Sequence, residues 1–260
     1  MARDGEGHDL VSVISRRLGI LRTLRRPRDK RQLVETLDLS RSTVDRAIRR
    51  LESLGLVTRD ERYRLTAAGR IAVDRFEEFT DDLEDVVESR ELLTALPPDA
   101  PVGMSLLRDA DVHLPAGPTP TEPIRDGLER VRDADRFHLM IRQITLPEGL
   151  SLIKESVTEA GTSARCVLAR TLVEHLRQDD DTWLADMVET PECELRVVDR
   201  LPYTLGTLRD ADGRRTTLIV YGPEGNLRGV VDNDTFRAFA WGETVFQKYY
   251  GNAEPLDAVG

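Results

Sequence analysis

The feature that most constrains the fold is a pair of short helical segments joined by a tight turn. Asp29 and Ser40 are suited to begin helices over 30–37 and 41–54, because their side-chain oxygens accept hydrogen bonds from first-turn amides. Gly55 then ends the second helix, at a position where left-handed backbone is common. Each helix has one apolar stripe, formed by Leu33, Val34 and Leu37 in the first and by Val44, Ala47, Ile48, Leu51 and Leu54 in the second. The pattern predicts a helix-turn-helix.

A further helix and a hairpin flank this pair. The segment that begins at Asp9 has apolar residues at helical spacing, and Pro27 ends it because proline breaks a helix interior. After Gly55, two strand-like segments, 56–59 and 62–65, enclose a polar turn and predict a hairpin. Three helices followed by a hairpin are the order of a winged helix-turn-helix.

Positive charge is concentrated in the same region. Residues 10–72 contain 16 Arg and Lys against 7 Asp and Glu, whereas residues 73–260 contain 20 against 37. A basic segment within an acidic protein is typical of a domain that binds a polyanion. The chain has three lysines, Lys30, Lys154 and Lys248. Strong acidity with so little lysine indicates a salt-adapted cytoplasm, and a GC-rich genome is the alternative explanation for the arginine excess.

The second helix of the pair carries arginines and small polar residues opposite its apolar stripe. At about 100° per residue, Ser42, Arg46 and Arg49 lie on that face and Thr43 flanks it. In a helix-turn-helix this face enters the major groove of DNA. Arg46 and Arg49 suit bidentate bonds to guanine, and the two hydroxyls suit phosphate, adenine or thymine-methyl contacts.

Other arginines suit contacts to the DNA backbone. Arg41 and Arg50 are placed to bind phosphates, which fix the register without reading sequence. The hairpin arginines would follow the flanking backbone or enter a narrow minor groove. The predicted DNA-binding residues are Arg41, Ser42, Thr43, Arg46, Arg49, Arg50, Arg59, Arg62 and Arg64.

Two other interpretations of this region stay open. A charged helix face is often merely solvated, but solvation alone does not account for the turn, the glycine stop, the arginine-bearing hairpin and the regional charge split together. The alternative function is a protein-interaction adaptor that uses the winged helix for docking in place of DNA binding.

A long helix follows the hairpin. Thr66 is suited to begin it, and the pattern extends from Ala67 to about Leu93. Ala72, Phe76, Phe79, Leu83, Val86 and Leu93 form a heptad-like seam, with Arg90 in its one polar position. We expect Phe76, Phe79, Leu83 and Val86 to contact a second copy of the chain, because DNA-binding dimers of this kind match palindromic half-sites. The alternative is that the seam packs on the chain's own C-terminal domain.

Beyond two proline-rich stretches, near 96–101 and 115–123, helices and strands alternate. Helices are expected at 122–134, 147–160, 171–189 and 234–250, and strands at 136–144, 164–169, 194–199, 203–209, 215–221 and 227–231. This order predicts an α/β domain with a central mixed sheet. The predicted organisation is a flexible tail (1–9), a winged helix-turn-helix (10–66), a linking and dimerisation helix (67–94), a linker (95–121) and an α/β effector or assembly domain (122–260).

The C-terminal half has no recognisable catalytic motif. The His-x-Lys of phospholipase D, Gly-x-Gly-x-x-Gly, the P-loop, Gly-x-Ser-x-Gly and His-Glu-x-x-His are all absent from the sequence, so we expect no enzyme activity. His138 and His175 are expected to be ordinary core or surface histidines, and no cofactor or metal site is predicted. Cys166 and Cys193 are expected to be structural thiols, with a redox role as the minor alternative.

An effector crevice is expected at the carboxyl ends of the strands, as in other α/β sheets. Arg142, Arg170, Arg200 and Tyr203 could anchor an anionic metabolite there, although the arginines could equally pair with local carboxylates. The run 232–234 (Asp-Asn-Asp) resembles a cation site, but Asn233 or Asp234 as the cap of the last helix explains it adequately.

Two family resemblances accompany this reading. Segments 39–48, 51–57 and 65–69 resemble prokaryotic winged-helix regulators of the MarR/ArsR-like kind, over about a quarter of the chain. Segments 225–233 and 240–243, with Phe246, Tyr249, Tyr250 and 253–256, resemble the C-terminal domain of archaeal regulators typified by the methanogenesis regulator FilR1. The second resemblance implies an archaeal, specifically haloarchaeal, transcription regulator with an unassigned sensor domain.

Location and partners follow from these inferences. The sequence has no apolar run of about 18 residues and no signal-peptide pattern at its start, so we expect a cytoplasmic protein without membrane contact. The expected partners are double-stranded DNA, a second copy of the chain, and a small-molecule effector of unknown identity if the C-terminal domain is a sensor.

Overall fold

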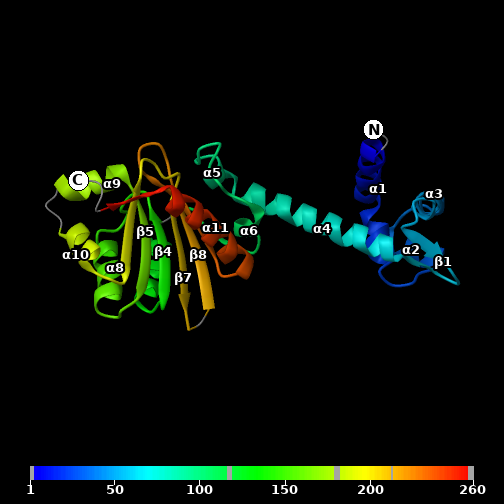
Figure 1. Cartoon of the computed structure of the whole chain (residues 1–260). Coiled ribbons are helices and arrows are strands. Elements are labelled where there is room, and N and C mark those ends of the chain that lie inside the picture. The colour runs from blue at the N-terminus through cyan, green and yellow to red at the C-terminus, as the bar shows by residue number, and fades with distance from the viewer. Residues whose placement is uncertain (1–2, 116–118, 179–181, 212, 257–260) are drawn as a thin grey trace. The chain divides into compact units, whose positions relative to one another are not determined.

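The computed structural model describes residues 3–115, 119–178, 182–211 and 213–256. The chain folds as two compact units, Met1–Glu84 and Asp85–Gly260. Figure 1 shows the order of the elements along the chain. Each unit has its own hydrophobic core, and each is described separately below.

The N-terminal unit consists of helices and one small hairpin. Its elements are α1 (Arg3–Thr23), α2 (Lys30–Leu37), α3 (Arg41–Ser53), β1 (Val57–Arg59), β2 (Tyr63–Leu65) and the greater part of α4 (Ala67–Glu88). The two strands pair antiparallel, with Val57 opposite Leu65. This is the element order predicted from the sequence.

The local signals that predicted these elements act as expected. Asp29 accepts a hydrogen bond from the amide of Gln32, whose side chain bonds back to the amide of Asp29, so α2 begins with a capping box. Ser40 accepts from the amide of Thr43 at the start of α3. Gly55 follows α3 with φ +70°, a conformation that favours glycine.

The start of the chain differs from the prediction. Helix α1 begins at Arg3, six residues before Asp9, so residues 3–9 are helical and do not form the predicted tail. The Asp9 carboxylate bonds the guanidinium of Arg50 on α3, a contact between residues 41 apart that local spacing does not reveal. Residues 1–2 of the predicted tail lie outside the described residues.

The C-terminal unit is a mixed sheet with helices on both faces. After the last turn of α4, its helices are α5 (Arg90–Leu93), α6 (Met104–Leu107), α7 (Glu122–Arg132), α8 (Glu148–Thr158), α9 (Arg170–Gln178), α10 (Trp183–Glu189) and α11 (Phe236–Asn252). Its strands are β3 (Asp111–His113), β4 (Arg136–Ile141), β5 (Ser163–Ala169), β6 (Cys193–Val198), β7 (Thr204–Asp210), β8 (Gly213–Tyr221), β9 (Leu227–Asn233) and β10 (Glu254–Pro255).

The eight strands lie in the order β10-β6-β5-β4-β7-β8-β9-β3. The neighbours β4, β5 and β6 are parallel, and every other pair is antiparallel. The predicted fold class is therefore confirmed: an N-terminal helical domain with a hairpin, a long helix, and an α/β domain with a central mixed sheet. Sequence patterns missed β3 and β10, which are short edge strands of three and two residues.

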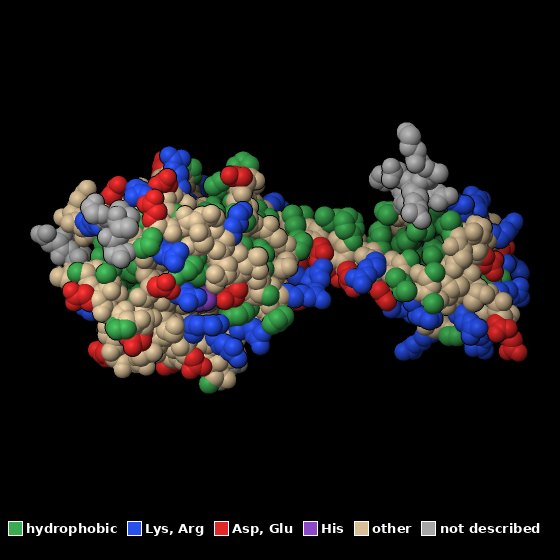
Figure 2. Space-filling view, in the orientation of Figure 1, with side chains coloured by type: hydrophobic (Ala, Val, Ile, Leu, Met, Phe, Trp, Pro, Cys, Tyr) green, Lys and Arg blue, Asp and Glu red, His purple; other side chains and the backbone are tan. Residues whose placement is uncertain are grey.

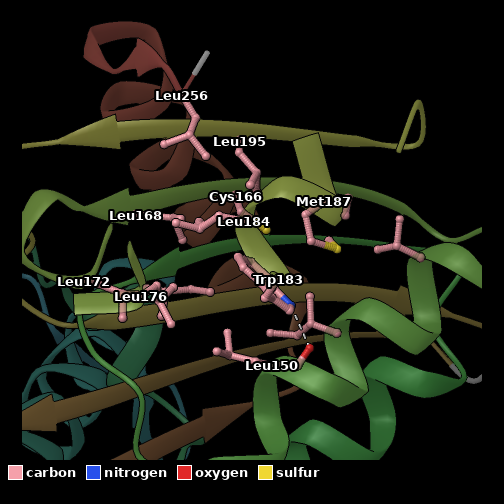
Figure 3. Packing of buried hydrophobic residues seen from close by; sticks show 14 of the residues in the cluster. Leu150, Cys166, Leu168, Leu172, Leu176, Trp183, Leu184, Met187, Leu195 and Leu256 are labelled. Carbon is pink, nitrogen blue, oxygen red and sulfur yellow. Dashed lines mark hydrogen bonds between the residues drawn. The ribbon is translucent and has the colours of Figure 1, made fainter. Parts of the chain in front are cut away.

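Each face of the sheet has its own apolar core. Helices α8, α9 and α10 cover β4, β5 and β6 on one face, where Trp183 is buried and its indole N–H donates to the carbonyl of Leu150 at 2.8 Å (Figure 3). Helix α11 packs on the opposite face through Val245, Phe246 and Tyr250. Helix α7 packs on β8 and β9 through Ile124, in a smaller cluster on the same face as α8.

The predicted helix to Leu93 is interrupted. Helix α4 ends at Glu88, Ser89 breaks it, and Leu92 and Leu93 belong to the separate α5. The reason is tertiary: Leu92 is fully buried among residues of the sheet and α11, a position that the straight continuation of α4 does not supply. Leu93 packs on this core and is therefore not part of the predicted seam on α4.

The predicted linker over 95–121 is wrong for most of its length. Residues 104–107 form α6 and residues 111–113 form the edge strand β3, paired with β9. The side-chain amide of Asn233 holds α6 in place by donating to the carbonyls of Leu106 and Arg108. Residues 116–118 of the linker, like 179–181 of the predicted helix 171–189, lie outside the described residues.

Asn233 and Asp234 do not cap the last helix. The N-cap of α11 is Thr235, whose hydroxyl accepts from the amide of Ala238 at 3.2 Å. Asn233 is committed to the α6 carbonyls, and Asp232 bonds Arg215 and Thr217. The predicted cap was therefore one or two residues too early.

Helix α4 approaches the hairpin closely at one glycine. Thr66 accepts from the amide of Gly69 and donates to the carbonyl of Gly55, so the start of α4 is tied to the segment before β1. An added Cβ at Gly69 would lie 2.0 Å from the carbonyl oxygen of Leu56. A side chain at Gly69 thus requires α4 and this backbone to separate.

We expect Gly69→Ala to lower the free energy of unfolding by about 1–3 kcal/mol, the usual cost of overpacking. The measurement is chemical denaturation followed by circular dichroism. Gly251→Ala is the matched control, because an added Cβ there meets no heavy atom within 4 Å and the helix should lose no stability. Equal stability of the two variants would contradict the close approach at Gly69.

Candidate nucleic-acid interface

One side of α3 is locked in the N-terminal core. Val44, Ala47, Ile48 and Leu51 are all exposed by 1% or less. Because these four side chains fix the rotation of the helix about its axis, the opposite side of α3 must face solvent.

That opposite side carries the residues predicted to read DNA. Ser42, Arg46, Arg49 and Ser53 are exposed, and Thr43 is half-buried. The hydroxyls of Ser42 and Thr43 lie 3.0 and 2.8 Å from the hydroxyl of Ser40, so they cluster at the N-terminus of α3. Backbone amides at a helix N-terminus and nearby hydroxyls are donors that suit phosphate oxygens.

The arginines of this surface divide into free and paired groups. Among the described residues, Arg41, Arg46 and Arg62 make no ion pair within 4 Å, and Arg49 donates only to the backbone carbonyl of Asp45. Arg50 instead pairs with Asp9 at the edge of the face. Arg41 and Arg49 lie near enough to Asp45 to help lower the pKa of its carboxyl.

The hairpin presents a smaller basic surface. Arg59 lies over the ring of the buried Tyr63, 5.2 Å from its centroid, and Arg64 is 3.5 Å from the carboxylate of Asp60. Arg62 lies in the turn before β2, whereas Arg64 lies within that strand. Figure 2 shows Lys and Arg side chains gathered on the part of this unit that carries α3 and the hairpin.

Lys30 was not among the residues predicted for the DNA-binding surface, yet it links α2, α3 and the hairpin. Its ammonium group lies 2.5 Å from Asp45 on α3 and 5.8 Å from the centroid of Tyr63 in the hairpin. The hydrogen bond from Lys30 is the main cause that lowers the pKa of Asp45. No local signal in the sequence shows this contact, because it joins the first residue of α2 to the middle of α3 and to the wing.

The predicted dimer residues differ in their surroundings. Phe76 packs in part on the N-terminal core. Phe79, Leu83 and Val86 are exposed by 53%, 48% and 37%, although all three are large and apolar. The exposed part of the seam therefore runs from Phe79 to Val86.

The four predicted effector anchors are largely committed to partners within the chain. Arg170 bonds Asp199 and Glu254. For this residue the alternative interpretation, pairing with local carboxylates, is the one that the contacts match. Arg142 donates to the carbonyl of Pro202, and the buried Tyr203 donates to the carbonyl of Pro101. Arg200 is exposed and lines a hollow at the carboxyl ends of the parallel strands together with Arg142, Asp99 and Asp199. Its charges are mixed, so this hollow does not favour an anion.

Of the two cysteines, Cys166 is buried and Cys193 is half-buried. Cys166 is fully buried, and both a hydrogen bond with Cys193 and this burial raise the pKa of its thiol, so it stays protonated and unreactive at neutral pH. Among the described residues, no three His, Cys, Asp or Glu side chains lie close enough together to hold a metal ion. No helix in the same part of the chain is both long and apolar enough to cross a membrane.

A polar cluster lies between β4, β7 and α11. His138 on β4 is 5% exposed, stacks on Phe246 with ring centroids 4.5 Å apart, and places Nδ1 2.9 Å from Glu243 on α11. Thr207 on β7 donates to the same carboxylate oxygen at 2.5 Å. Burial by itself raises the pKa of Glu243, but the hydrogen bonds from His138 and Thr207 outweigh it, and the net pKa is lowered. His138 is thus a satisfied core histidine, as expected.

Comparison with known proteins supplies the family. Residues 120–252, slightly more than half of the chain, match the model for the middle domain of the methanogenesis regulatory protein FilR1. The chain belongs to this family. Residues 6–88 match a second family model, described as the HVO_A0261 N-terminal domain. The resemblance of the C-terminal half to FilR1 is confirmed, and the two FilR1 and HVO_A0261 matches together span both units.

Other comparisons add little to the family match. One solved structure, described as that of TrmBL2, an archaeal chromatin protein with a novel mode of DNA binding, aligns over 84% of both chains with a TM-score of 0.45 and 15% identity. No curated protein sequence matches the chain.

We expect Glu243→Gln to destabilise this FilR1-family protein by about 1 kcal/mol at pH 7, because a hydrogen bond to a charged group exceeds one to a neutral group by about that amount. A lowered pKa stabilises the fold above the unfolded pKa of the carboxyl, and the benefit is lost as pH falls through the folded pKa. The stability gap should therefore narrow below about pH 4.5. Denaturation midpoints from pH 7 to 3.5 test this, with the exposed Glu224→Gln as control. A gap that stays constant over this range would contradict the role of the charge.

Proposed function

We propose that the chain is a sequence-selective DNA-binding transcription regulator. The observation that carries this proposal is the exposed face of α3, where, within the described part of the chain, Arg46 and Arg49 make no ion pair within 4 Å while the opposite face is buried. Guanidinium groups in this position are available to bind phosphates and base edges. Residues 10–72 contain 16 basic and 7 acidic residues, and this positive balance also supports DNA as the partner.

Each residue of the surface has a proposed role. Arg46 and Arg49 bind guanine edges in the major groove, and Ser42 and Thr43 contact phosphate, adenine or a thymine methyl group. Arg41 binds phosphate, and Arg50 does so after exchanging Asp9 for the DNA backbone. Arg59, Arg62 and Arg64 of the hairpin follow the flanking backbone or a narrow minor groove.

The family and the composition support a regulatory role. The FilR1 name describes a regulatory protein, and its domain model covers the C-terminal half of this chain. The acidic composition and the three lysines fit a haloarchaeal cytoplasm, where counterion release contributes little to binding. In such a cell the base contacts of α3 carry more of the selectivity. The C-terminal domain modulates this binding, either by sensing a small molecule or by assembly.

We expect Arg46→Ala and Arg49→Ala each to weaken binding to a selected site by about 5- to 150-fold, which corresponds to the 1–3 kcal/mol of a bidentate guanine contact. The site is first selected from a random duplex library with the full chain. Affinities are then measured for this site and for a scrambled duplex across a range of salt concentrations.

Arg31→Ala is the matched control for these two variants. Arg31 lies on α2 and is paired with Glu35. Its substitution removes one positive charge, as the other two variants do, but from a residue outside the proposed face. This variant should bind the selected duplex and the scrambled duplex slightly more weakly than the wild type does, by the same factor for both. Selective binding that survives both Arg46→Ala and Arg49→Ala would refute the assigned face, and the absence of DNA binding at any salt would favour the docking adaptor.

We also propose that the protein acts as a homodimer through α4. Phe79, Leu83 and Val86 lie at positions i, i+4 and i+7 of one helix, so they form a single apolar stripe that water surrounds in the isolated chain. A partner helix would remove this stripe from water, and two copies would present two α3 helices to the two halves of a palindromic site. Figure 2 shows hydrophobic side chains along α4.

The double variant Phe79→Glu with Leu83→Glu is expected to convert the dimer to a monomer, because the seam would then bury unpaired charge. Sedimentation equilibrium at a stated salt concentration measures the mass. Ile71→Glu is the control, since Ile71 is 63% exposed on the same helix but lies outside the seam. A dimer that persists in the double variant would remove α4 as the interface.

A further inference from the structure

The C-terminal unit contains an apolar cavity that no feature of the DNA-binding surface explains. It encloses about 100 Å³ and lies between helices α7 and α8 and strands β4, β7 and β8. Aliphatic side chains form most of its wall, including Leu128, Ile141, Ile153 and Ile219. A dry apolar cavity of roughly 150 Å³ binds a molecule the size of benzene, so the space suits a small ligand.

Three of the positions that line the cavity hold glycine. On α7, Gly127 falls on the apolar stripe of Ile124, Leu128 and Val131, at the spacing of a face that packs on the sheet. Gly149 on α8 and Gly206 on β7 also line the cavity. These glycines come from separate elements, and each removes a side chain from the same space.

Two of these gaps are already filled by neighbouring leucines. An added Cβ would lie 3.2 Å from Leu128 at Gly149 and 3.2 Å from Leu139 at Gly206, whereas at Gly127 it would meet no heavy atom within 4 Å. The open space therefore lies beside Gly127, which lines both this cavity and a second, polar hollow that includes Glu122, Asp126 and Arg130. A glycine inside a helix is unfavourable by about 1 kcal/mol relative to alanine, so this gap has no benefit for the helix itself.

One end of the cavity is polar, and none of its lining residues is charged. The hydroxyl of Tyr221 lies 2.8 Å from that of Thr145 and 3.4 Å from that of Thr204. Gln143 also lines this end, and its amide donates to the carbonyl of Gly225. A hydroxyl pair can rearrange to accept or donate one further hydrogen bond. The guanidinium of Arg142 lies over the Tyr221 ring, 5.7 Å from its centroid, but it is outside the lining and donates to the carbonyl of Pro202.

We propose that this cavity binds a small, uncharged, mainly apolar molecule, with one hydroxyl or carbonyl group directed to Tyr221 and Thr145. The apolar body of the ligand occupies the space beside Gly127 and packs on Ile124 and Ile219. Binding of such a molecule would stabilise the contact of α7 with β8, because both elements would share the same apolar filling. This inference concerns the C-terminal unit alone and does not depend on whether α3 binds DNA.

Titration of the full chain with 4-ethylphenol tests the proposal, with binding measured by calorimetry and by saturation-transfer NMR. Wild-type protein should bind this probe, bind ethylbenzene more weakly, and bind 4-ethylbenzoate at least tenfold more weakly because the wall has no cation. Equal affinity for the phenol and the benzoate, or no binding of the phenol, would overturn the proposal.

Variants locate the probe. Gly127→Leu should reduce affinity for 4-ethylphenol at least tenfold, and Gly127→Ala should reduce it less. Gly127→Ala should not lower the melting temperature, since its Cβ meets no heavy atom within 4 Å. Gly251→Leu is the matched control, a helix glycine with equally open surroundings in α11, and should bind like the wild type. Tyr221→Phe should abolish the preference for the phenol over ethylbenzene. Wild-type affinity in Gly127→Leu would place the probe elsewhere and overturn the assignment, whatever the DNA-binding result.

Discussion

Four apolar side chains of α3, Val44, Ala47, Ile48 and Leu51, pack in the N-terminal core, and their burial determines what that unit presents to solvent. A helix locked along one side has no freedom to rotate, so its outer face is fixed as well. The hairpin is then fixed relative to α3 by short contacts: the backbone of Arg28 pairs with Tyr63, and Lys30 connects Asp45 to the Tyr63 ring. The same burial that stabilises the domain therefore also orients its arginines.

The elements that could be predicted from the sequence are those with local causes. Asp29, Ser40 and Thr66 begin helices by accepting bonds from amides three residues ahead, and Gly55 ends one through its backbone conformation. Such signals lie within one turn of chain, so a single sequence displays them. Strands β4 and β5 were also predictable, because each contains an unbroken apolar run, 139–141 and 166–169.

The elements that were mispredicted depend on distant contacts. The break at Ser89 follows from the burial of Leu92 under the sheet, and α6 is held by Asn233, over 120 residues away. The sequence around Ser89 contains no local signal that ends a helix. Likewise, nothing local to Asn233 indicates that its side chain bonds α6. The same limit applies to the first turns of α1, whose Asp9 pairs with Arg50.

The candidate sites show a similar division. Helical spacing was enough to identify the exposed residues of α3. It did not show which of the arginines are paired with carboxylates, because Asp9 and Arg50 are far apart in the chain. The cavity could not be predicted at all, since Gly127, Gly149 and Gly206 lie on three elements and look unrelated in the sequence. Conversely, the arginines expected to hold an anion turned out to serve the fold: Arg170 ties β5 and β6 to the C-terminal strand through Asp199 and Glu254.

The positive charge on the outer face of α3 is carried entirely by guanidinium groups. A guanidinium presents its N–H donors in one rigid plane, so Arg41, Arg46 and Arg49 can each form two parallel hydrogen bonds to a single acceptor group. The same face is exposed, so dissolved salt screens it, and its attraction for a polyanion falls as ionic strength rises. Geometry therefore contributes the part of its binding that salt changes least.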